Sequence, residues 1–252
     1  MTEQVKDFSE QTVVIAGAAQ GIGKATAQLL HEKGARIIAL DISMDGLSSL
    51  EEELGLDEIQ VHQINLAEQE AVSTLMSKIH VEFGQIHALV NSVGIVGPSG
   101  VNVENVLWSD FEKTLAINLF GAIWLTQSVI PSMKDNSYGR IVHLASIAGK
   151  EGNPGMSPYN VSKSGMIGFV KGVAKEVAPF GITVNALAPA VINTHMNANT
   201  SEETLKYMIS RIPMGRLGEV EEIAQMLAFM ASKACSFTTG FTFDASGGRA
   251  TY

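Results

Sequence analysis

A tyrosine and a lysine four residues apart, Tyr159 and Lys163, could together move a proton. Near the start of a predicted helix, positions i and i+4 share one face. A tyrosine hydroxyl, with a pKa of about 10, is a poor base at neutral pH, but a nearby positive charge favours the phenolate. Tyr159 could then take a proton from an alcohol or give one to a ketone. Ser146, at the end of a predicted strand, could hold the substrate oxygen. Alone, the pair is also consistent with a tyrosine packed on a lysine stem.

Three glycines, Gly17, Gly21 and Gly23, follow a predicted buried strand and open a predicted helix. Glycine permits a tight turn and a close approach of backbone to a ligand. The helix N-terminus then offers free N–H groups and its positive dipole end to a pyrophosphate. The spacing is G-x-x-x-G-x-G, so a purely structural turn is the alternative. The place of this loop at the first strand–helix junction favours a dinucleotide site, which includes Gln20 and Ile22.

An acid, Asp41, ends the second predicted strand, 18 residues beyond Gly23. A carboxylate at this place can accept hydrogen bonds from the adenosine ribose hydroxyls, and it would repel a 2′-phosphate. The next residue is Ile42, which offers no positive charge to offset Asp41. The sequence therefore predicts NAD as cofactor rather than NADP. A helix N-cap acid is the alternative interpretation of Asp41.

Strands and helices must alternate to position these residues. Strand-like apolar runs lie at residues 12–16, 36–41, 60–65, 88–91, 140–145, 183–188 and 239–243. Amphipathic helical patterns lie at residues 23–33, 67–83, 108–133, 159–178 and 220–231. Nearly continuous apolar strands are typical of a parallel sheet that is buried on both faces. The alternation predicts a Rossmann-type doubly wound α/β fold of about seven parallel strands with helices on both faces.

The length and hydrophobic content fit one domain. The chain has 252 residues, of which 46% are hydrophobic, enough for a large core. We predict a single dinucleotide-binding catalytic domain over residues 1–252. Residues 191–216 interrupt the alternation just after a strand, on the side of the sheet where ligands bind. This segment is predicted to be a substrate lid.

The charge balance bears on possible partners. The 17 basic and 26 acidic residues give a net charge of −9, and no Lys/Arg cluster interrupts it. Nucleic acid and anionic membrane surfaces are therefore not expected partners. The N-terminus is polar, unlike a signal peptide, and we expect no stretch that approaches ~18 uncharged apolar residues, the length of a membrane span.

Cysteine and histidine usage adds two expectations. The single cysteine, Cys235, cannot form an internal disulfide, which fits a cytoplasmic location. The six histidines show no ligand spacing, so no metal site is predicted. His143, in a predicted buried strand, is expected to be a core histidine with its hydrogen bonds satisfied.

Taken together, these motifs resemble the short-chain dehydrogenase/reductase family over essentially the whole chain. The matching positions are Gly17, Gly21, Gly23, Asn91, Ser92, Val93, Gly94, Asn118, Ser146, Tyr159, Lys163, Asn185, and Pro189 through Ile192 to Thr194. Their order and spacing all fit, and jointly they are highly specific.

The resemblance implies a catalytic tetrad of Asn118, Ser146, Tyr159 and Lys163. Tyr159 would be the acid/base, and Ser146 would orient the reacting oxygen. Lys163 would lower the pKa of Tyr159 and bind the nicotinamide ribose. Asn118 would hold a water that links Lys163 to solvent. An asparagine in mid-helix is disfavoured, which by itself indicates a role without naming one.

The resemblance also implies further cofactor contacts. Asn91 would support the cofactor, Asn65 and Leu66 would meet the adenine, and Ile192 and Thr194 would contact the nicotinamide carboxamide. The predicted cofactor-binding residues are Gly17, Gln20, Gly21, Ile22, Gly23, Asp41, Ile42, Asn65, Leu66, Asn91, Val93, Gly94, Tyr159, Lys163, Pro189, Ile192 and Thr194.

Five positions depart from the usual family pattern. Ala16 stands where the family usually has threonine, and Asn65 where it has aspartate. Ser92 and Val93 replace the middle of the usual Asn-Asn-Ala-Gly, and Ala190 replaces the glycine of Pro-Gly. None of these changes removes a catalytic group, so the predicted reaction is unaffected.

The substrate is expected to meet segments 94–100, 147–158 and 191–216. The middle segment resembles the subset that oxidises sugars and sugar acids, including 2-keto-3-deoxy sugar-acid 4-dehydrogenases. Asn153 and His195 could bond hydroxyls beside Ser146, and Lys150 or Arg211 could meet a carboxylate. The alternative is that Lys150 and Arg211 are solvated surface charges.

Two other functions compete with this one. A 3-oxoacyl carrier-protein reductase on the same scaffold would use NADPH and need a basic surface; Asp41 and the net charge of −9 count against it. A non-catalytic dinucleotide-sensing protein would not need the intact tetrad.

The resemblance further implies a homotetramer. Small residues on the long predicted helices would allow close helix approach, and residues 246–252 would lie near an interface. The small residues in question are Gly121, Ala122, Gly165, Gly168 and Gly172.

Overall fold

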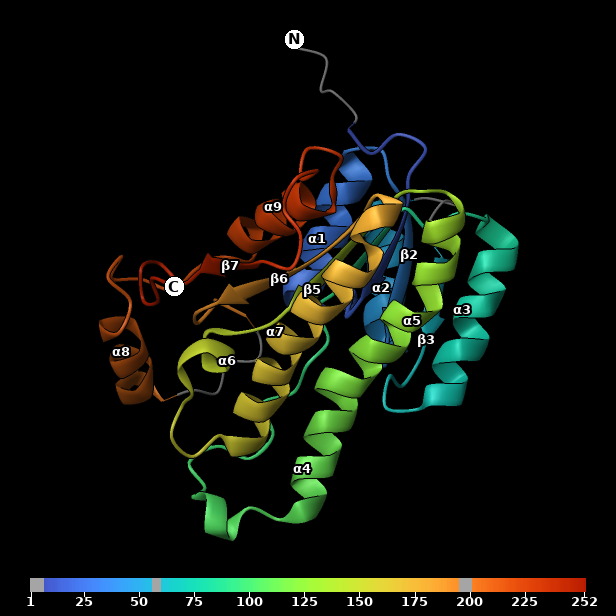
Figure 1. Ribbon diagram of the computed structural model, residues 1–252. Helices are drawn as coiled ribbons and strands as arrows, with labels where there is room; N and C mark the ends of the chain where they lie inside the picture. Colours follow the sequence, from blue (N-terminus) through green and yellow to red (C-terminus); the bar gives the residue numbers. More distant parts are fainter. Residues whose placement is uncertain (1–6, 56–59, 195–200) are drawn as a thin grey trace.

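The computed structural model describes residues 7–55, 60–194 and 201–252, and its centre is one sheet of seven strands (Figure 1). All paired strands are parallel, in the order β3-β2-β1-β4-β5-β6-β7. The strands are β1 (Thr12–Ala16), β2 (Arg36–Asp41), β3 (Gln60–Gln63), β4 (Ala88–Asn91), β5 (Gly139–Leu144), β6 (Ile182–Pro189) and β7 (Thr242–Ala245). β1, β4 and β6 are buried at every residue, as strands covered on both faces must be. The predicted fold class is confirmed.

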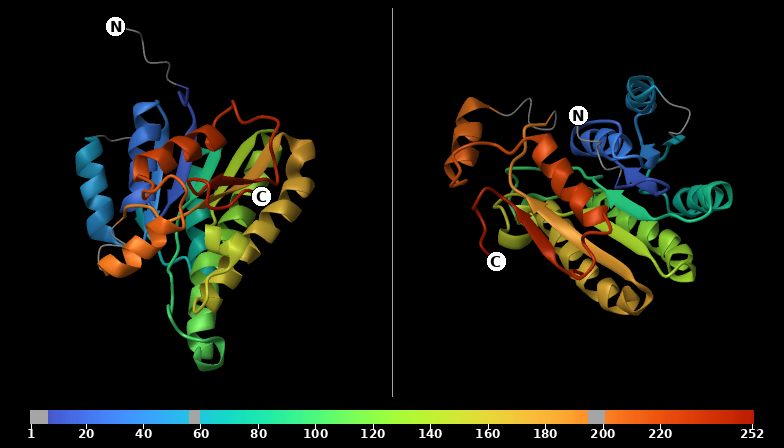
Figure 2. Two further views of the ribbon diagram at one scale, coloured as in Figure 1. Left: turned by 90° about the vertical axis from the view of Figure 1, so that its left-hand side faces the viewer. Right: turned by 90° about the horizontal axis from the view of Figure 1, so that it is seen from above.

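Helices cover both faces of the sheet (Figure 2). The α-helices of the described residues are α1 (Gly21–Glu32), α2 (Met44–Leu54), α3 (Gln69–Phe83), α4 (Trp108–Leu115), α5 (Gly121–Asp135), α6 (Ile147–Glu151), α7 (Ser157–Val177), α8 (Glu202–Ser210) and α9 (Val220–Ala231). Short 3-10 turns lie at Val103–Asn105 and Ala178–Phe180, and a π-helical turn at Ala116–Phe120 joins α4 to α5.

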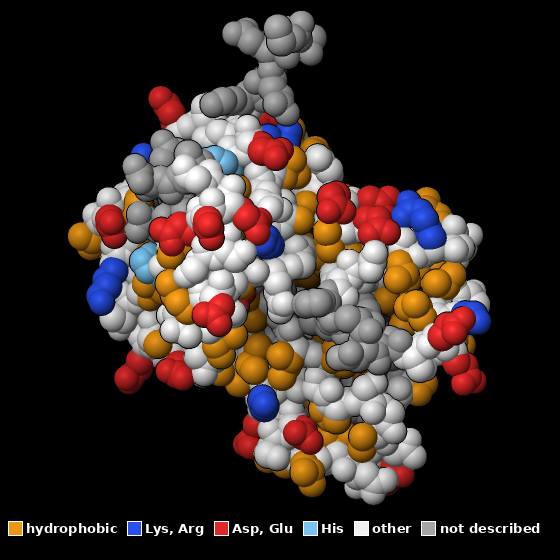
Figure 3. All heavy atoms as spheres, turned by 180° about the vertical axis from the view of Figure 1, so that it is seen from behind, with side chains coloured by type: hydrophobic (Ala, Val, Ile, Leu, Met, Phe, Trp, Pro, Cys, Tyr) orange, Lys and Arg blue, Asp and Glu red, His pale blue; other side chains and the backbone are white. Residues whose placement is uncertain are grey.

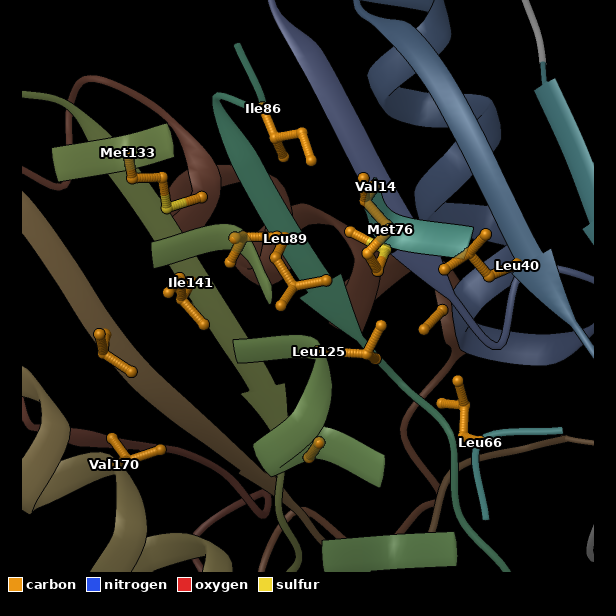
Figure 4. Packing of buried hydrophobic residues seen from close by; sticks show 14 of the residues in the cluster. Val14, Leu40, Leu66, Met76, Ile86, Leu89, Leu125, Met133, Ile141 and Val170 are labelled. Carbon is orange, nitrogen blue, oxygen red and sulfur yellow. The ribbon is translucent and has the colours of Figure 1, made fainter. Parts of the chain in front are cut away.

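Two apolar layers hold these helices to the sheet. One layer packs α3, α5 and α7 against strand side chains such as Val14, Leu89 and Ile141 (Figure 4). The other packs α1, α2 and α9 against the alternate side chains of the same strands, such as Val13 and Ile15. This division follows from the pleat, which sends successive side chains of a strand to opposite faces.

Three helices were not predicted: α2, α6 and α8. α6 has five residues, too few to show a helical period, and α8 buries none of its residues. α2 and α8 each begin at a serine cap, where Ser43 accepts from the Gly46 N–H and Ser201 from the Thr204 N–H. The predicted strand at 239–243 was placed too early, since β7 begins at Thr242.

The expectation that no stretch is long and apolar enough to span a membrane is wrong by length and composition. Residues 114–133 carry no charged side chain, and the continuous helical run Trp108–Asp135 has a window of mean hydropathy 1.3. The same run buries Ala122, Leu125 and Val129 against the sheet. A helix at the core of a globular domain has both properties.

The carboxyl ends of all strands meet at one edge of the sheet because the strands are parallel. β1 and β4 are neighbours although β2 and β3 come between them in the chain. At such a topological switch point the loops diverge and leave a crevice where ligands bind. The glycine loop after β1, the 91–94 segment after β4 and Ser146 after β5 therefore reach the same place.

Candidate active site

Tyr159 and Lys163 lie on the first turns of α7, which begins at Ser157 and has Pro158 in its first turn. Lys163 is 3% exposed. Its Nζ lies 5.8 Å from the centre of the Tyr159 ring and donates to the Leu144 carbonyl at 2.7 Å. The predicted i, i+4 arrangement thus places the ammonium beneath the phenol, and the end of β5 holds it there.

Burial perturbs the two groups in opposite senses. It raises the pKa of the Tyr159 hydroxyl, and a hydrogen bond with Ser146 opposes that rise. It lowers the pKa of Lys163 to about 8, because a buried ammonium loses its hydration. Burial is therefore the largest influence on the pKa of the Tyr159 hydroxyl. The lowering of that pKa by Lys163 together with an oxidised nicotinamide stays a prediction.

Ser146 caps α6, and its Oγ accepts from the Ala148 N–H at 3.1 Å. The same hydroxyl is the hydrogen-bond partner of Tyr159. Two polar groups, one phenolic and one aliphatic, therefore converge on one point at the carboxyl end of β5. A substrate oxygen bound there would meet a hydrogen-bond donor and a group able to exchange its proton.

Asn118 lies in the π-helical turn, where the regular helix is interrupted. Its Oδ1 accepts from the Ile95 N–H and its Nδ2 donates to the Ile95 carbonyl, both at 2.8 Å. Nδ2 also donates to the Ser162 hydroxyl at 3.0 Å. A Cβ at Gly94 would lie 3.3 Å from Lys163 Nζ and 3.5 Å from Asn118 Oδ1. The structure thus brings all four residues of the expected tetrad to one place.

The glycine loop has the geometry of an anion site. Gly17 has φ +86°, and a Cβ at Gly23 would lie 1.9 Å from the Gly17 carbonyl oxygen, so larger residues would break the turn. α1 begins at Gly21, and no side chain caps it, which leaves its first N–H groups free for a ligand.

Ser92 matches a family position, but the sequence predicts no role for it. Its Oγ donates to the Ala16 carbonyl at 2.9 Å, and a Cβ at Gly17 would lie 2.6 Å from it. Ser92 therefore ties the segment after β4 to the glycine loop after β1. Its place in the Asn91–Gly94 motif was the sequence feature that could have indicated this role.

Asp41 lies beside the glycine loop. Its Oδ2 accepts from the Ala19 N–H and its Oδ1 from the Ser43 N–H, both at 3.0 Å. Each carboxylate oxygen keeps a second lone pair for a ribose hydroxyl. Ile42, the next residue, is exposed and offers an apolar surface at this end of the site.

Asn65 and Leu66 follow β3. Asn65 Oδ1 already accepts from the Ala67 N–H at 3.1 Å, and its Nδ2 donates to Glu68 at 2.8 Å. Leu66 is buried. Any contact of Asn65 with an adenine amine would therefore use the remaining lone pair of Oδ1.

The segment after β6 closes over the glycine loop. Ile192 pairs with Gly218 in an isolated parallel bridge and is buried. A Cβ at Gly21 would lie 3.7 Å from the Thr194 methyl group. Pro189 ends β6, so the predicted residues 189–194 lead from the sheet to the start of α1.

Two of the predicted substrate residues, Lys150 and Asn153, have partners within the protein. The Lys150 ammonium pairs with Asp244 at 2.9 Å, and the Asn153 Oδ1 accepts from Arg249 at 3.0 Å. These groups thus bind Asp244 of β7 and Arg249 of the C-terminal segment, and their contact with a substrate stays a prediction. Arg211 is exposed at the end of α8, and His195 lies outside the described residues.

His143 is a core histidine with its hydrogen bonds satisfied, as predicted. Among the described residues, no group of three or more His, Cys, Asp or Glu is arranged to hold a metal ion. The arrangement can therefore provide an anion-binding turn, a ribose acceptor and a buried proton-transfer group, all at one sheet edge.

Known proteins are similar to this chain over nearly its whole length. A family model described as enoyl-(acyl carrier protein) reductase, of the short-chain alcohol dehydrogenase type, matches residues 17–250. The 2-dehydro-3-deoxy-L-rhamnonate dehydrogenase (NAD(+)) of Sphingomonas sp. (strain SKA58) is 40% identical over 97% of this chain and 97% of its own. The 3-oxoacyl-(acyl-carrier-protein) reductase of Thermotoga maritima is 38% identical over 93% of this chain and 96% of its own. Among solved structures, NAD+-bound xylitol dehydrogenase superposes with a TM-score of 0.89 at 30% identity, covering 96% of this chain and 99% of that one.

Proposed function

Because the chain belongs to the short-chain dehydrogenase/reductase family, we propose that it is an NAD-dependent dehydrogenase that oxidises a secondary hydroxyl of a sugar acid, or reduces the corresponding ketone. The observation that carries this proposal is the buried Lys163 ammonium, which the Leu144 carbonyl holds 5.8 Å from the centre of the Tyr159 ring. A proton-transfer group placed at the carboxyl edge of a dinucleotide-binding sheet is what such a reaction requires.

Each residue of the tetrad has a separate task in this proposal. Oxidation of an alcohol removes a hydride from carbon and a proton from oxygen, and NAD+ supplies the hydride acceptor when bound. Ser146 holds the substrate oxygen, and Tyr159 takes the proton from it. Lys163 places a positive charge beneath the phenol and meets the nicotinamide ribose. Asn118 holds the Ile95 segment against α7.

The cofactor is NAD. The Sphingomonas relative is named as NAD(+)-dependent, and the xylitol dehydrogenase structure holds NAD+. Asp41 supports this assignment, because its carboxylate stands beside the glycine loop where a 2′-phosphate would be repelled. We assign the pyrophosphate to the turn that begins at Gly17 and ends in α1.

A sugar acid is the favoured substrate class because the 40% identical relative acts on a deoxy sugar acid. The second candidate is reduction of a 3-oxoacyl carrier protein, which the 38% identical Thermotoga relative favours. An acidic carrier would meet a surface of the same sign, since acidic side chains are spread over the face seen in Figure 3, with basic ones scattered among them.

The test is a spectrophotometric one. The purified chain is mixed with NAD+ and a panel of keto-deoxy sugar acids, aldonic acids and polyols, and NADH absorbance is followed. We expect turnover with at least one sugar acid. Turnover of acetoacetyl thioesters with NADPH, together with silence on the panel, would establish the second candidate. Dinucleotide binding without any turnover would establish a sensing protein.

We also propose a single domain over residues 1–252, a lid over the substrate at 191–216 and a homotetramer in the cytoplasm. The lid is supported by α8, which lies at the same end of the molecule as α6 (Figures 1 and 2). The tetramer is supported by two aromatic patches, in each of which exposed rings lie beside half-buried ones. One is on the α4–α5 run (Trp108, Phe111, Phe120 and Trp124) and the other is on α9 and β7 with its preceding loop (Phe229, Phe241 and Phe243). The small substrate and the chain itself are then the only partners proposed, with neither nucleic acid nor membrane.

A further inference from the structure

A buried imidazole lies directly beside the candidate site. His143 is on β5, where it pairs in register with Asn91 of β4, and neither residue is more than 2% exposed. The next residue, Leu144, offers the carbonyl that binds the Lys163 ammonium. Thr126 of α5, also buried, and the edge of the Phe169 ring of α7 complete the surroundings of the imidazole.

The hydrogen bonds around His143 determine which ring nitrogen carries the proton. Thr126 donates its hydroxyl hydrogen to the Ala122 carbonyl at 2.7 Å, so its oxygen can only accept from His143 Nε2 at 2.9 Å. Nε2 is therefore protonated, and Nδ1 is left as an acceptor. Asn91 Nδ2 faces that acceptor at 3.4 Å. Burial and the positive charge of Lys163 lower the pKa of His143 to about 3, so the ring is neutral at physiological pH.

Asn91 connects the His143 imidazole to the segment after β4. With its Nδ2 turned to His143, its Oδ1 accepts from the Val93 N–H at 3.2 Å. The following residue, Gly94, is the one packed against Lys163 Nζ and Asn118 Oδ1. A single polar chain thus runs from Ala122 and Thr126 of α5, through His143 and Asn91, to the backbone beside the tetrad.

We propose that His143, together with Thr126, is a positioning residue that sets the side-chain orientation of Asn91 and thereby holds the 91–94 segment ready for the dinucleotide. The physical requirement is an acceptor facing Asn91 Nδ2. Without one, a buried amide N–H is left unpaired, and the side chain or the segment must move to recover the bond. This inference rests on the proposed NAD-dependent function for its effect on binding, but the hydrogen-bond chain itself can be tested without NAD.

The binding test compares variants that differ in one hydrogen bond. His143→Phe keeps a ring but removes both nitrogens, whereas His143→Asn restores an acceptor oxygen near the place of Nδ1. His87→Phe is the matched control. His87 Nδ1 also accepts a hydrogen bond, from the Thr12 N–H at 3.0 Å, but it lies at the amino ends of β1 and β4, at the sheet edge opposite the site. We expect His143→Phe to raise the Kd of NAD+ and its KM by about tenfold, the effect of one lost buried hydrogen bond. The kcat at saturating NAD+ should change less, and His143→Asn should recover most of the loss. His87→Phe should leave the Kd within about twofold at a similar loss of Tm.

A second arm needs neither activity nor NAD. Hydrogen exchange of the peptide that contains Val93 should be faster in His143→Phe than in the wild type and unchanged in His87→Phe. In the wild type, the imidazole ¹⁵N spectrum should show His143 protonated at Nε2, and Thr126→Val, which removes the acceptor, should release that preference.

The outcomes separate the two proposals. A wild-type protein that binds no NAD+ would overturn the proposed function, and exchange at Val93 would still decide the role of His143. Equal NAD+ affinity and equal exchange in His143→Phe and the wild type would overturn the positioning role, as would an imidazole protonated at Nδ1. If His143→Phe does not fold, the role of His143 is tested instead with His143→Asn, Thr126→Val and the wild-type ¹⁵N spectrum.

Discussion

At the scale of single residues, the site combines a phenol that burial makes less acidic with an ammonium that burial makes more acidic. The raised pKa of Tyr159 keeps its proton on the oxygen at neutral pH, which suits donation to a ketone. Oxidation of an alcohol requires the phenolate. It therefore depends on the positive charges of Lys163 and of the oxidised nicotinamide. Rising pH should favour it only until Lys163, whose pKa is lowered to about 8, loses its proton.

Tyr159→Phe removes the proton-transfer oxygen and leaves the ring. We expect turnover to fall by about 10²–10⁴-fold, the usual contribution of a positioned acid/base, with little change in the Kd of NAD+. Initial rates with the preferred sugar acid and calorimetric titration with NAD+ check both parts. A variant that keeps more than about a tenth of the wild-type rate would remove Tyr159 from the acid/base role.

Asp41→Asn keeps an acceptor oxygen beside the glycine loop and removes the charge that repels a 2′-phosphate. The ratio of kcat/KM for NADP+ to that for NAD+ should rise by about tenfold or more, since like-charge repulsion is lost. Asp41→Ala should shift the ratio in the same direction but weaken both cofactors, because the bonds to the Ala19 and Ser43 N–H groups are lost as well. An unchanged ratio in both variants would mean that this carboxylate does not face the ribose.

The neutral His143 makes stability depend on pH. Its pKa is about 3 in the folded protein against 6.5 ordinarily, so below pH 6.5 the unfolded chain binds a proton that the folded chain does not. Stability from this group is present above that pH and is lost as pH falls towards 3, by up to about 1.4 kcal/mol per unit. The gap in unfolding free energy between the wild type and His143→Phe should therefore narrow from pH 7 to pH 4. Urea denaturation at several pH values measures it, and a constant gap would contradict the prediction.

At the scale of elements, the C-terminal segment braces the short helix that follows Ser146. Arg249 Nε pairs with Glu151 and its Nη2 with Asn153, while Tyr252 donates its hydroxyl hydrogen to the Lys150 carbonyl. These contacts span about a hundred residues of sequence and hold the polar end of α6, a helix of five residues. The shape of the substrate side of the site is thus decided partly by the last residues of the chain.

Arg249→Leu should loosen this brace. Because the pair is largely buried, with the Arg249 side chain 10% exposed, we expect about a tenfold rise in the KM for the sugar acid and an unchanged Kd for NAD+. Lys24→Met, which removes the α1–α2 ion pair with Glu53, is the control and should leave that KM alone. Steady-state kinetics at saturating NAD+ provide the comparison. A higher Kd for NAD+ with no change in substrate KM would contradict the prediction that Arg249 supports the substrate side of the site.

At the scale of the whole molecule, two patches contain exposed aromatic side chains that the proposed tetramer would bury. Trp108 is 70% exposed and Phe241 is 56% exposed, on elements that lie apart in the fold. If each patch pairs with its own copy across a two-fold axis, the two patches together give the proposed closed assembly of four copies.

Sedimentation velocity at micromolar concentration should show a tetramer. Phe241→Ser, which makes one patch polar, should shift it to a dimer, and Trp108→Ser with Phe120→Ser should do the same through the other patch. Lys206→Ser on exposed α8 is the control and should leave the tetramer intact. A wild-type monomer at these concentrations would contradict the proposed assembly.

The sequence determined the fold class and most of the elements, because apolar runs long enough to be buried on both faces leave few other arrangements. A strand end and a helix start indicated that Ser146 and Tyr159 could work together, whereas Asn118 was assigned to the tetrad only by the resemblance to the family. It could not find α6 and α8, which are too short or too exposed to show a period. Nor could it find partners far away in the chain. Lys150 binds Asp244 of β7 and Asn153 binds Arg249 of the C-terminal segment. Asn91, His143 and Thr126 form one hydrogen-bond chain. Those pairings, and the burial that raises one pKa and lowers another, exist only once distant elements pack together, so only the tertiary structure decides them.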